Sequence, residues 1–422
     1  MQQQSNLKPD TSANDEMASI GASVQHIRIK PGKPLAEQPE IGHNRWHPDI
    51  PELTSVRPGD EIVLECLDFL DSQIKDTDSA NDVRDVDLTR AHPLTGPVHV
   101  EGAEPGDLLV VDLLDISCVT PVGFSGIFAK ENGGGFLVEH FPEANKAIWD
   151  LRGRYATSRH IPGVRVGAML HPGLIGTLPS QDLLNEWNRR EAILADKGQA
   201  RPPHPDTAVL RGVNGADFDR MAAEAARTVP PREHGGNLDI KNLTVGSRIY
   251  FPVYVKGAGL SLGDLHFSQG DGEISFCGAI EMDGAAHLGF DLIKGGMAKY
   301  NVTAPIYVPG IHDVRYDEWL SFTGISVEDG VNHYLDATVA YRRACLAAID
   351  YISSVTDLTK PQVYMLLTAA PVEGRYGGVV DLPNASASIS IPTRIFDVDI
   401  LPQDLVAGPA SYGRPGVEMT LS

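Results

Sequence analysis

The residues best suited to do chemistry lie in one short stretch, Gly263–Glu281, which reads GDLHFSQGDGEISFCGAIE. Apolar residues at its start continue a run that predicts a β-strand over 260–267. Because side chains two residues apart in a strand point to the same face, Asp264 and His266 are expected to project together. The stretch therefore predicts a carboxylate beside an imidazole.

A turn follows this strand. Gly270 and Gly272 flank Asp271 and permit a tight reversal, since glycine adopts positive φ at little steric cost. The reversal brings Asp271 and Glu273 near the first pair of polar residues. Two interpretations fit this pattern: a solvated polar turn with a half-buried histidine, or a metal site, because oxygen and imidazole ligands together suit zinc and similar divalent ions. The pattern alone leaves both open.

Several longer stretches resemble the acetamidase/formamidase family, and GDLHFSQGDGE is the most characteristic of them. The others run in the same order across most of the chain: His92–Ile116, Phe136–Asp150, Thr157–Ser180, Gly235–Leu243 and Pro371–Ala385. In length the chain is similar to the longer, formamidase-type branch. The resemblance implies hydrolysis of short aliphatic amides, a mainly β fold built of β-sandwich or jelly-roll-like and small barrel-like units with a minor α+β part, and a homo-oligomer.

Amide hydrolysis makes specific demands on such a site. The carbonyl is a poor electrophile and the amine a poor leaving group, so a divalent metal ion and a nearby carboxylate would meet both needs. We therefore expect Asp264 and His266 to be metal ligands, with zinc the expected ion and calcium the alternative. Glu273 is expected to be a ligand or proton shuttle, and Asp271 to orient either group.

Two further site residues depend on the resemblance. Family members carry an aspartate, glycines and Gln-Ile near the reaction centre, which implies that Asp68 is a third metal ligand. This chain departs from that pattern, since Phe69–Ser72 stands where the glycines would be. Glu373 lies in the glycine-rich segment PVEGRYGGVVDLPN and is a catalytic candidate.

Composition limits the partners and the compartment. A formal net charge of -21 argues against nucleic acid and anionic membrane surfaces. No apolar run approaches the roughly 20 residues that a membrane span needs. The N-terminus lacks the basic start and apolar core of a secretory signal. The 4 cysteines form no Cys-x-x-Cys pair, so a reduced, cytoplasmic protein is expected.

The 42 glycines and 30 prolines, with few long periodic segments, predict many turns between strands. We expect a disordered tail over 1–22, a β-rich domain over 23–184, a helical and proline-rich excursion over 185–234, and a second β-rich domain with helices over 235–422. The excursion is suited to cover a cleft or an oligomer face. Helices are predicted over 183–197, 217–227, 332–353 and 361–367.

Other polar residues near the motifs carry weaker expectations. Asn237 and Asp239 are two apart and are able to face the same side as the later site. Either His160 or His171 could approach a pocket, but both are predicted to be loop or interface histidines. The expected function is that of a metal-dependent formamidase that acts on formamide, with other short amides such as acetamide as further candidate substrates. The alternative is a non-catalytic small-ligand or carbohydrate-binding β-sandwich in which the same residues hold a structural metal.

Overall fold

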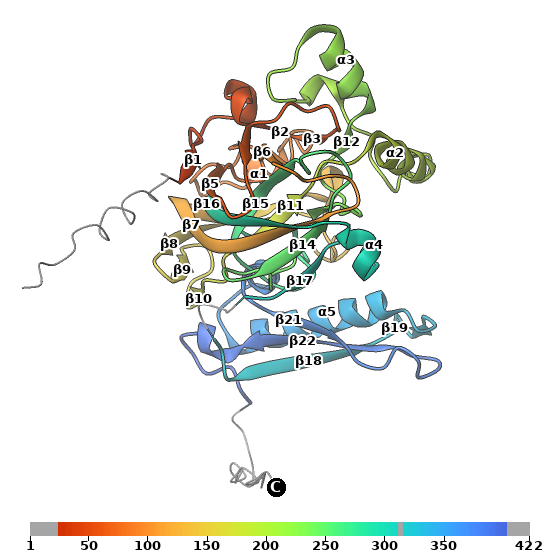
Figure 1. Cartoon of the computed structure of the whole chain (residues 1–422). Coiled ribbons are helices and arrows are strands. Elements are labelled where there is room, and N and C mark those ends of the chain that lie inside the picture. The colour runs from red at the N-terminus through yellow and green to blue at the C-terminus, as the bar shows by residue number, and fades with distance from the viewer. Residues whose placement is uncertain (1–23, 311–314, 403–422) are drawn as a thin grey trace, which may run out of the picture.

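The computed structural model describes residues 24–310 and 315–402 (Figure 1). The predicted tail over 1–22 lies outside the described residues, as does the end of the predicted C-terminal domain, 403–422. Within the described parts of the chain, strands make up most of the regular structure and helices are fewer. The prediction of a mainly β fold with a minor α+β part is therefore confirmed.

The described residues form the following elements. The strands are β1 (Gln25–Ile27), β2 (Gly42–His43), β3 (Arg45–Trp46), β4 (Thr54–Val56), β5 (Glu61–Cys66), β6 (Leu94–Val100), β7 (Leu108–Ile127), β8 (Asn145–Arg152), β9 (Tyr155–Ser158), β10 (Val166–Gly167), β11 (His171–Gly176), β12 (Ala226–Arg227), β13 (Gly235–Asn237), β14 (Arg248–Pro252), β15 (Leu260–Gln269), β16 (Phe276–Ile293), β17 (Ile306–Val308), β18 (Trp319–Ile325), β19 (Val327–Glu328), β20 (Val331–Asn332), β21 (Glu373–Tyr376) and β22 (Ser386–Pro392). The helices are α1 (Asn81–Arg84), α2 (Gln181–Ala195), α3 (Gly215–Glu224), α4 (Gly296–Tyr300), α5 (Ala337–Val355) and α6 (Lys360–Ala369).

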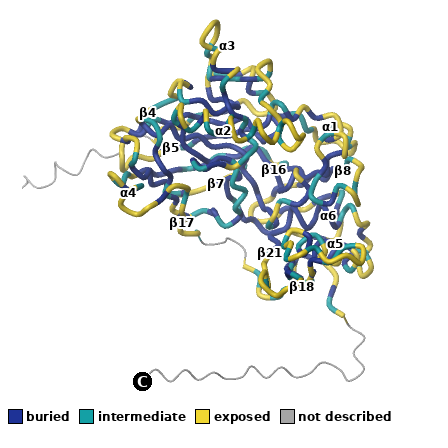
Figure 2. The backbone as a smooth tube through the Cα atoms, turned by 90° about the vertical axis from the view of Figure 1, so that its right-hand side faces the viewer, coloured by how far each residue is buried: buried dark blue, intermediate teal, exposed yellow. Residues whose placement is uncertain are grey.

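Most strands belong to one large sheet of 15 strands, whose main path runs β10-β9-β8-β7-β16-β15-β11-β13. The long strands β7 and β16 pair antiparallel along most of their length and form the centre of this sheet. Strands from both predicted β-rich domains join this sheet, while α2 and α3 lie outside it, in the upper part of Figure 1. The exposed surface of α3 stands apart from the buried strands in Figure 2. The domain boundaries themselves stay a prediction.

β15 is the strand around which the site is built. Every residue of its sequence, LSLGDLHFSQ, is buried, as expected for a strand covered on both faces. It pairs with β11 on one side, and β6 and then β16 pair along its other side. In this register His171 of β11 lies opposite His266, which in turn lies opposite Glu281 of β16. Three strands thus set three polar residues in one row.

The minor α+β part is a three-stranded sheet, β18-β22-β21, with α5 packed on it (Figure 1). α5 buries Val339, Ala340, Ala344, Cys345, Ala348, Ile349 and Ile352, an apolar stripe at helical spacing. α6 contacts both α5 and the large sheet, so it joins the two parts of the protein. The predicted helices over 332–353 and 361–367 are therefore confirmed, with shifts of a few residues at their ends.

The start of α5 gives a test of stability. The side chain of Asp336 accepts hydrogen bonds from the backbone N–H groups of Thr338 and Val339, which have no partner within the helix. Asp336→Ala removes this cap, and we expect the free energy of unfolding to fall by about 0.5–2 kcal/mol. Urea unfolding measures the change; Asp336→Asn, which keeps a capping oxygen, is expected to recover most of it. Equal losses in both variants would contradict the capping role.

Candidate active site

One cavity of about 170 Å³ joins the motif at 263–281 to apolar walls from distant parts of the chain. Asp264, Glu273 and His92 are among its polar lining residues, and Phe69 and Phe276 are among its aromatic ones. Other wall residues come from the predicted excursion over 185–234. That segment therefore borders the cavity.

His266 is the centre of the polar cluster behind this cavity. Its Nε2 atom lies 3.0 Å from Asp264 Oδ1 and 3.1 Å from Glu281 Oε2. All three side chains are buried. The pair Asp264 and His266 meets because both point to one face of β15, and Glu281 reaches them from the opposite position on β16. The predicted carboxylate–imidazole pair is thus present.

The other nitrogen of His266 is held by polar groups outside this carboxylate pair. His266 Nδ1 lies 2.9 Å from Gln269 Oε1 and 3.2 Å from His171 Nε2. His171 Nδ1 donates to the carbonyl of Met169 over 2.6 Å, so Nε2 of the neutral ring carries no proton, and this atom also lies 2.9 Å from Gln269 Oε1. Gln269 is fixed in turn because its amide donates to the carbonyl of Asp239. These contacts place the proton of neutral His266 on Nδ1 and leave Nε2 free to act as a ligand.

Asp239 and Glu273 extend the cluster on the cavity side. One carboxylate oxygen of Asp239 accepts a hydrogen bond from Asn237 Nδ2 at 2.9 Å. Its other oxygen, Oδ1, is buried and has no hydrogen-bond partner among the described residues. A buried acceptor without a partner is costly unless a ligand or water satisfies it. Asp239 Oδ1 therefore marks a position for a bound group.

Three of these acids adopt an uncommon backbone conformation. The φ angles of Asp239, Asp264 and Glu273 are 49°, 54° and 47°, in the left-handed region that side chains with a Cβ seldom occupy. Such strain is typical of sites in which the surrounding structure fixes functional groups. Here it turns three carboxylates toward one histidine.

Burial and the neighbouring charges shift the pKa values of the side chains in this cluster. Burial raises the pKa of Asp239 and of Glu281 to about 7, and the charge of Asp264 adds to both shifts. Burial, with Asp239 and Glu281 nearby, raises the pKa of Glu273 well above its usual range. Burial opposes ionisation of Asp264, but His266 lowers its pKa to about 2. For His266 burial is outweighed by Glu281 and Asp264, which raise its pKa well above the ordinary value. The cluster favours a positive charge at its centre.

Within the described residues, two overlapping groups have the composition of a metal site. Asp264, His266 and Glu281 form one, and Asp239, His266 and Glu273 form the other. In each group the candidate ligand atoms lie within 4.8 Å of one another. Carboxylate and imidazole ligands suit zinc, and the unpartnered Asp239 Oδ1 provides an acceptor that a cation would satisfy. The residues therefore fit a divalent cation.

Gly173 of β11 permits this close approach. A Cβ atom at this position would lie 2.5 Å from Asp264 Oδ2 and from His266 Cε1, and 2.8 Å from Asp239 Oδ1. Gly173→Ala therefore inserts a methyl group into the cluster without removing a polar side chain. We expect at least a tenfold loss of kcat/KM, equivalent to about 1.4 kcal/mol or more. Steady-state kinetics measure it, with circular dichroism as a check on folding; a variant with native activity would contradict this geometry.

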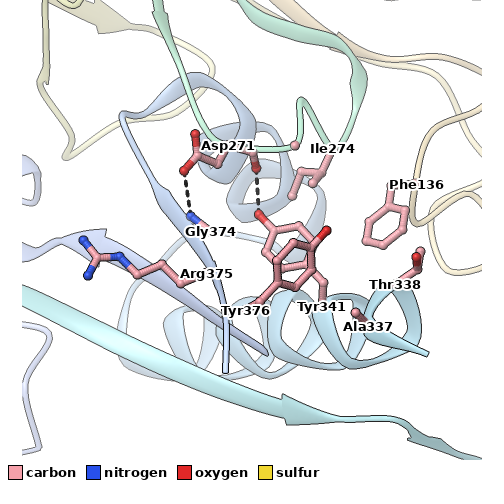
Figure 3. A pocket seen from close by; sticks show the side chains of 10 residues that line it. Phe136, Asp271, Ile274, Ala337, Thr338, Tyr341, Gly374, Arg375 and Tyr376 are labelled. Atoms are coloured by element: carbon pink, nitrogen blue, oxygen red, sulfur yellow. Dashed lines mark hydrogen bonds between the residues drawn. The ribbon is translucent and has the colours of Figure 1, made fainter. Parts of the chain in front are cut away.

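Asp271 lies close to Glu273 in sequence but faces another cavity. Its carboxylate accepts from the backbone N–H of Gly374 at 2.9 Å and pairs with Lys241 Nζ at 2.9 Å. Figure 3 shows Asp271 at this second cavity, beside Tyr341, which donates to its backbone carbonyl. The turn therefore separates Asp271 from Glu273 instead of bringing them together.

Glu373 shares a partner with Asp271. One of its carboxylate oxygens lies 3.6 Å from Lys241 Nζ, and the other accepts from Arg375 at 3.1 Å. The charge of Lys241 lowers the pKa of Glu373, although partial burial opposes this shift. Neither metal-type group contains Glu373 or Asp271. Their catalytic roles stay predictions, and the structure gathers both around a buried lysine.

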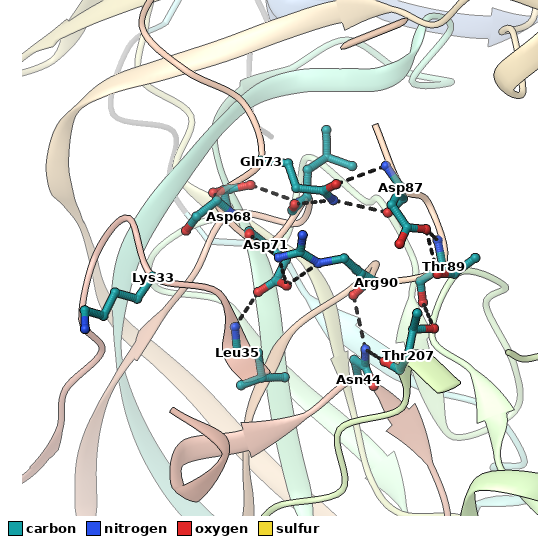
Figure 4. A network of polar contacts seen from close by, with 12 residues as sticks. Lys33, Leu35, Asn44, Asp68, Asp71, Gln73, Asp87, Thr89, Arg90 and Thr207 are labelled. Carbon is teal, nitrogen blue, oxygen red and sulfur yellow. Dashed lines mark hydrogen bonds and ion pairs between the residues drawn. The ribbon is translucent and has the colours of Figure 1, made fainter. Parts of the chain in front are cut away.

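Asp68 belongs to a third environment. Its two oxygens accept from the backbone N–H groups of Leu70 and Ser72, at 2.9 and 3.0 Å, and its own N–H donates to Asp283. Figure 4 shows Asp68 at a loop whose next acid, Asp71, is tied to the chain by further polar contacts. Asp68 lines a cavity of about 300 Å³ that is not the one at Asp264. As a metal ligand it stays a prediction; as a structural group it fixes the loop that carries Phe69.

Sequence reasoning missed several members of the cluster. Glu281 carried no signal, because its contact depends on the register of β16 against β15. The prediction of a loop or interface position for His171 is wrong, since this residue is buried in β11 beside His266. Gln269 and His92 were also not singled out. For Asp239 a usable signal existed, because it was expected to face the site.

Known proteins similar to this chain are amide hydrolases by name. The sequence profile of the acetamidase/formamidase family matches residues 28–398. A formamidase from Methylophilus methylotrophus is 53% identical over 399 residues, which cover 92% of this chain and 97% of that protein. An acetamidase from Mycolicibacterium smegmatis is 53% identical over 376 residues, covering 85% and 91%.

A solved structure agrees with the same comparison. The γ-lactamase from Delftia acidovorans superposes with a TM-score of 0.88 at 54% sequence identity, covering 92% of this chain and 96% of that one. The similarity therefore extends over the large sheet and over the α+β part alike.

Proposed function

The chain belongs to the acetamidase/formamidase family, and from this premise we propose that it hydrolyses short linear amides, formamide in particular, to a carboxylate and ammonia. The family prediction made from the sequence motifs is confirmed. The observation that carries the proposal is the buried cluster around His266, which opens through Asp264 and Glu273 onto a cavity suited to a small molecule. Non-catalytic binding finds no support among relatives that are named for amide hydrolysis.

We propose further that the cluster holds a divalent cation, zinc in particular. Asp264, His266 and Glu281 would hold it, with Asp239 and Glu273 as the alternative carboxylates on the cavity side. A bound cation of this kind polarises a carbonyl and lowers the pKa of a water molecule. Calcium prefers six to eight oxygen ligands, so an imidazole at the centre favours zinc.

The chain's own residues supply the remaining chemistry. Glu273 lines the cavity, and its raised pKa makes its carboxylate a stronger base than an ordinary glutamate. Once ionised beside a bound cation, it would be able to take a proton from water and to deliver it to the leaving nitrogen. Gln269 and His171 hold the ring of His266 in one orientation during these changes. Phe69 and Phe276 provide apolar wall surface beside the reacting amide.

Ammonia release from formamide tests the proposal directly. The purified protein is assayed as prepared, after exhaustive chelation, and after the addition of zinc, with metal content measured in each sample. We expect chelation to remove most of the activity and zinc to restore it. A fully active protein shown to contain no metal would contradict the cation, and metal-replete protein that hydrolyses no amide would contradict the amidase proposal.

The substrates to compare are chosen from the names of the similar proteins and from the apolar walls of the cavity. Formamide and acetamide differ by one methyl group, which an apolar pocket distinguishes by roughly 1–3 kcal/mol. A γ-lactam belongs in the panel because the superposed relative is named a γ-lactamase. We propose formamide as the preferred substrate, and kcat/KM values across the panel rank the three classes.

We propose a homo-oligomer because one edge strand of the large sheet exposes apolar side chains. Strand β17 presents three exposed apolar residues, Ile306, Tyr307 and Val308, and an exposed apolar edge strand is a typical interface. Light scattering coupled to size-exclusion chromatography measures the subunit number. No helix in the described ranges combines the length and apolar character required to cross a bilayer. A cytoplasmic location stays a proposal.

A further inference from the structure

Two arginines line the active-site cavity together with Asp264 and Glu273. Arg227 is half-buried at the end of β12, and Arg201 is exposed in the proline-rich segment after α2. Both come from the excursion over 185–234, which therefore brings positive charge to a cavity that the large sheet lines with carboxylates. The charge of Arg227 is felt at the site, because burial first and then Arg227 lower the pKa of His92 to about 4.

Neither arginine has an acidic partner within the described part of the chain. The one hydrogen bond that the guanidinium of Arg227 makes among the described residues is a long one, 3.4 Å, to the carbonyl of Leu88. The neighbouring Arg232, by contrast, is held by both oxygens of Glu191 at 2.7 and 2.9 Å. Burial, and then the charges of Arg201 and Arg232, lower the pKa of Arg227, although Glu191 opposes this shift from its ion pair with Arg232. Most donors of Arg227 are thus left for a ligand.

The reaction itself creates a suitable ligand. A neutral amide enters, and hydrolysis breaks its C–N bond, transfers oxygen from water to the acyl carbon, and produces a carboxylate and ammonia. That carboxylate forms beside several acidic side chains, so it is repelled unless positive charge faces it. An arginine matches a carboxylate because its planar fork donates two parallel hydrogen bonds.

We propose that Arg227, assisted by Arg201, binds a ligand carboxylate in the active-site cavity, as the first contact of the released product or of a second, anionic end of the substrate. This inference rests on the proposed amidase function for the identity of its ligand. The shared chemistry is a small carboxylate. The two sources differ in when the anion is present, and experiment separates them.

Product inhibition is the first test. The inhibition constants of formate and acetate are measured against formamide for the full-length protein and for Arg227→Gln and Arg227→Lys. We expect Arg227→Gln to raise these constants by about tenfold or more, since a charged hydrogen bond is lost. Arg227→Lys keeps the charge but loses the fork, so its constants are expected between the two. Unchanged constants in Arg227→Gln would overturn the proposal.

Arg201→Gln provides a second variant, because its exposed side chain can change without disturbing the fold, and a smaller rise in the same direction is expected. Arg152→Gln is the matched control: it removes one positive charge from an exposed position on β8 outside the cavity. Equal effects of Arg152→Gln and Arg227→Gln would assign the change to the overall charge of the protein and overturn the proposal.

A comparison of two substrates shows whether Arg227 binds the released product or an anionic end of the substrate. The monoamide of malonic acid carries a carboxylate, and malonic diamide is its neutral counterpart. A substrate site predicts that the wild type prefers the monoamide and that Arg227→Gln abolishes this preference. A product site predicts no such preference, with the inhibition constants alone affected. Either result supports carboxylate binding by Arg227.

A binding measurement that needs no hydrolysis tests the carboxylate site independently of the proposed amidase function. Nuclear magnetic resonance of ¹³C-formate reports binding through line broadening, with no need for hydrolysis. If no amide is hydrolysed but broadening depends on Arg227, the amidase proposal fails and the carboxylate site stands. If amides are hydrolysed but neither broadening nor inhibition depends on Arg227, the carboxylate site fails alone.

Discussion

Replacing His266 with alanine is expected to lower kcat/KM for formamide by more than about 100-fold, because the loss of even an outer partner of a metal ligand has effects of 10–100-fold. His266 belongs to both metal-type groups, and its Nε2 atom lies between the carboxylates of Asp264 and Glu281. Without the imidazole these buried acids lose their shared partner. The assay is ammonia release, and metal content is measured on the same samples.

The control for this variant lies on β16, the strand that carries Glu281. His287 pairs with the exposed Glu61 at 2.8 Å, outside the cluster. His287→Ala is expected to keep its metal and its activity. Thermal unfolding separates a local effect of His266→Ala from global destabilisation, since removing one partner from a buried charged cluster also weakens the fold. A folded His266→Ala protein that retains metal and native activity would overturn the metal assignment.

The pairing of Asp264 with His266 was predictable because it depends on local geometry alone. Side chains two residues apart in a strand share a face whatever the neighbouring strands do. The left-handed φ of 54° at Asp264, which the sequence did not indicate, departs from this regular geometry, and the carboxylate still lies 3.0 Å from His266. The position of Glu281 depends instead on the register between β15 and β16, which shifts between His266 and Gln269. A shift of one residue would turn Glu281 to the opposite face. Such a register is set by tertiary packing, so the sequence pattern could not reveal this third acid.

The turn shows a second limit of local reasoning. Asp271 and Glu273 are two residues apart, but alternation applies only within a strand. Gly272 and Glu273 both have positive φ, 90° and 47°, and the chain reverses between the two acids. Lys241, from a segment distant in sequence, then draws Asp271 to its own side. The glycines correctly predicted a turn, although the directions of its side chains depended on a distant lysine.

Distant segments complete the cluster and explain why the predicted and observed sites overlap only in part. Asp239 and His171 come from different regions of the chain and meet at β15 through the pairing of β11. Asp68 was inferred from a family pattern whose glycines are absent here, and its oxygens are occupied by the backbone of its own loop. The fold class could be predicted because turn residues and alternation are distributed along the whole sequence, whereas the full ligand set requires knowledge of strand pairing.

Glu273→Gln is expected to lower kcat for formamide by about 10²–10⁴-fold, the usual contribution of a positioned general acid or base. The amide is nearly isosteric with the carboxyl group but cannot take up a proton from water. Glu273 is a strong candidate because burial and its acidic neighbours raise its pKa well above the usual range, while its side chain borders the cavity. Steady-state kinetics and metal content are measured together.

Metal content decides which of its two predicted roles Glu273 has. A proton shuttle predicts that Glu273→Gln keeps its metal and nearly unchanged KM, because only proton transfer is lost. A ligand predicts that metal and activity decline together and that added zinc recovers part of both. Glu373→Gln and Asp271→Asn are the matched comparisons, since these acids surround Lys241 instead. If either of them loses more activity than Glu273→Gln, the proton-transfer role belongs to the Lys241 cluster, and the cavity at Asp264 is left with substrate and cation binding alone.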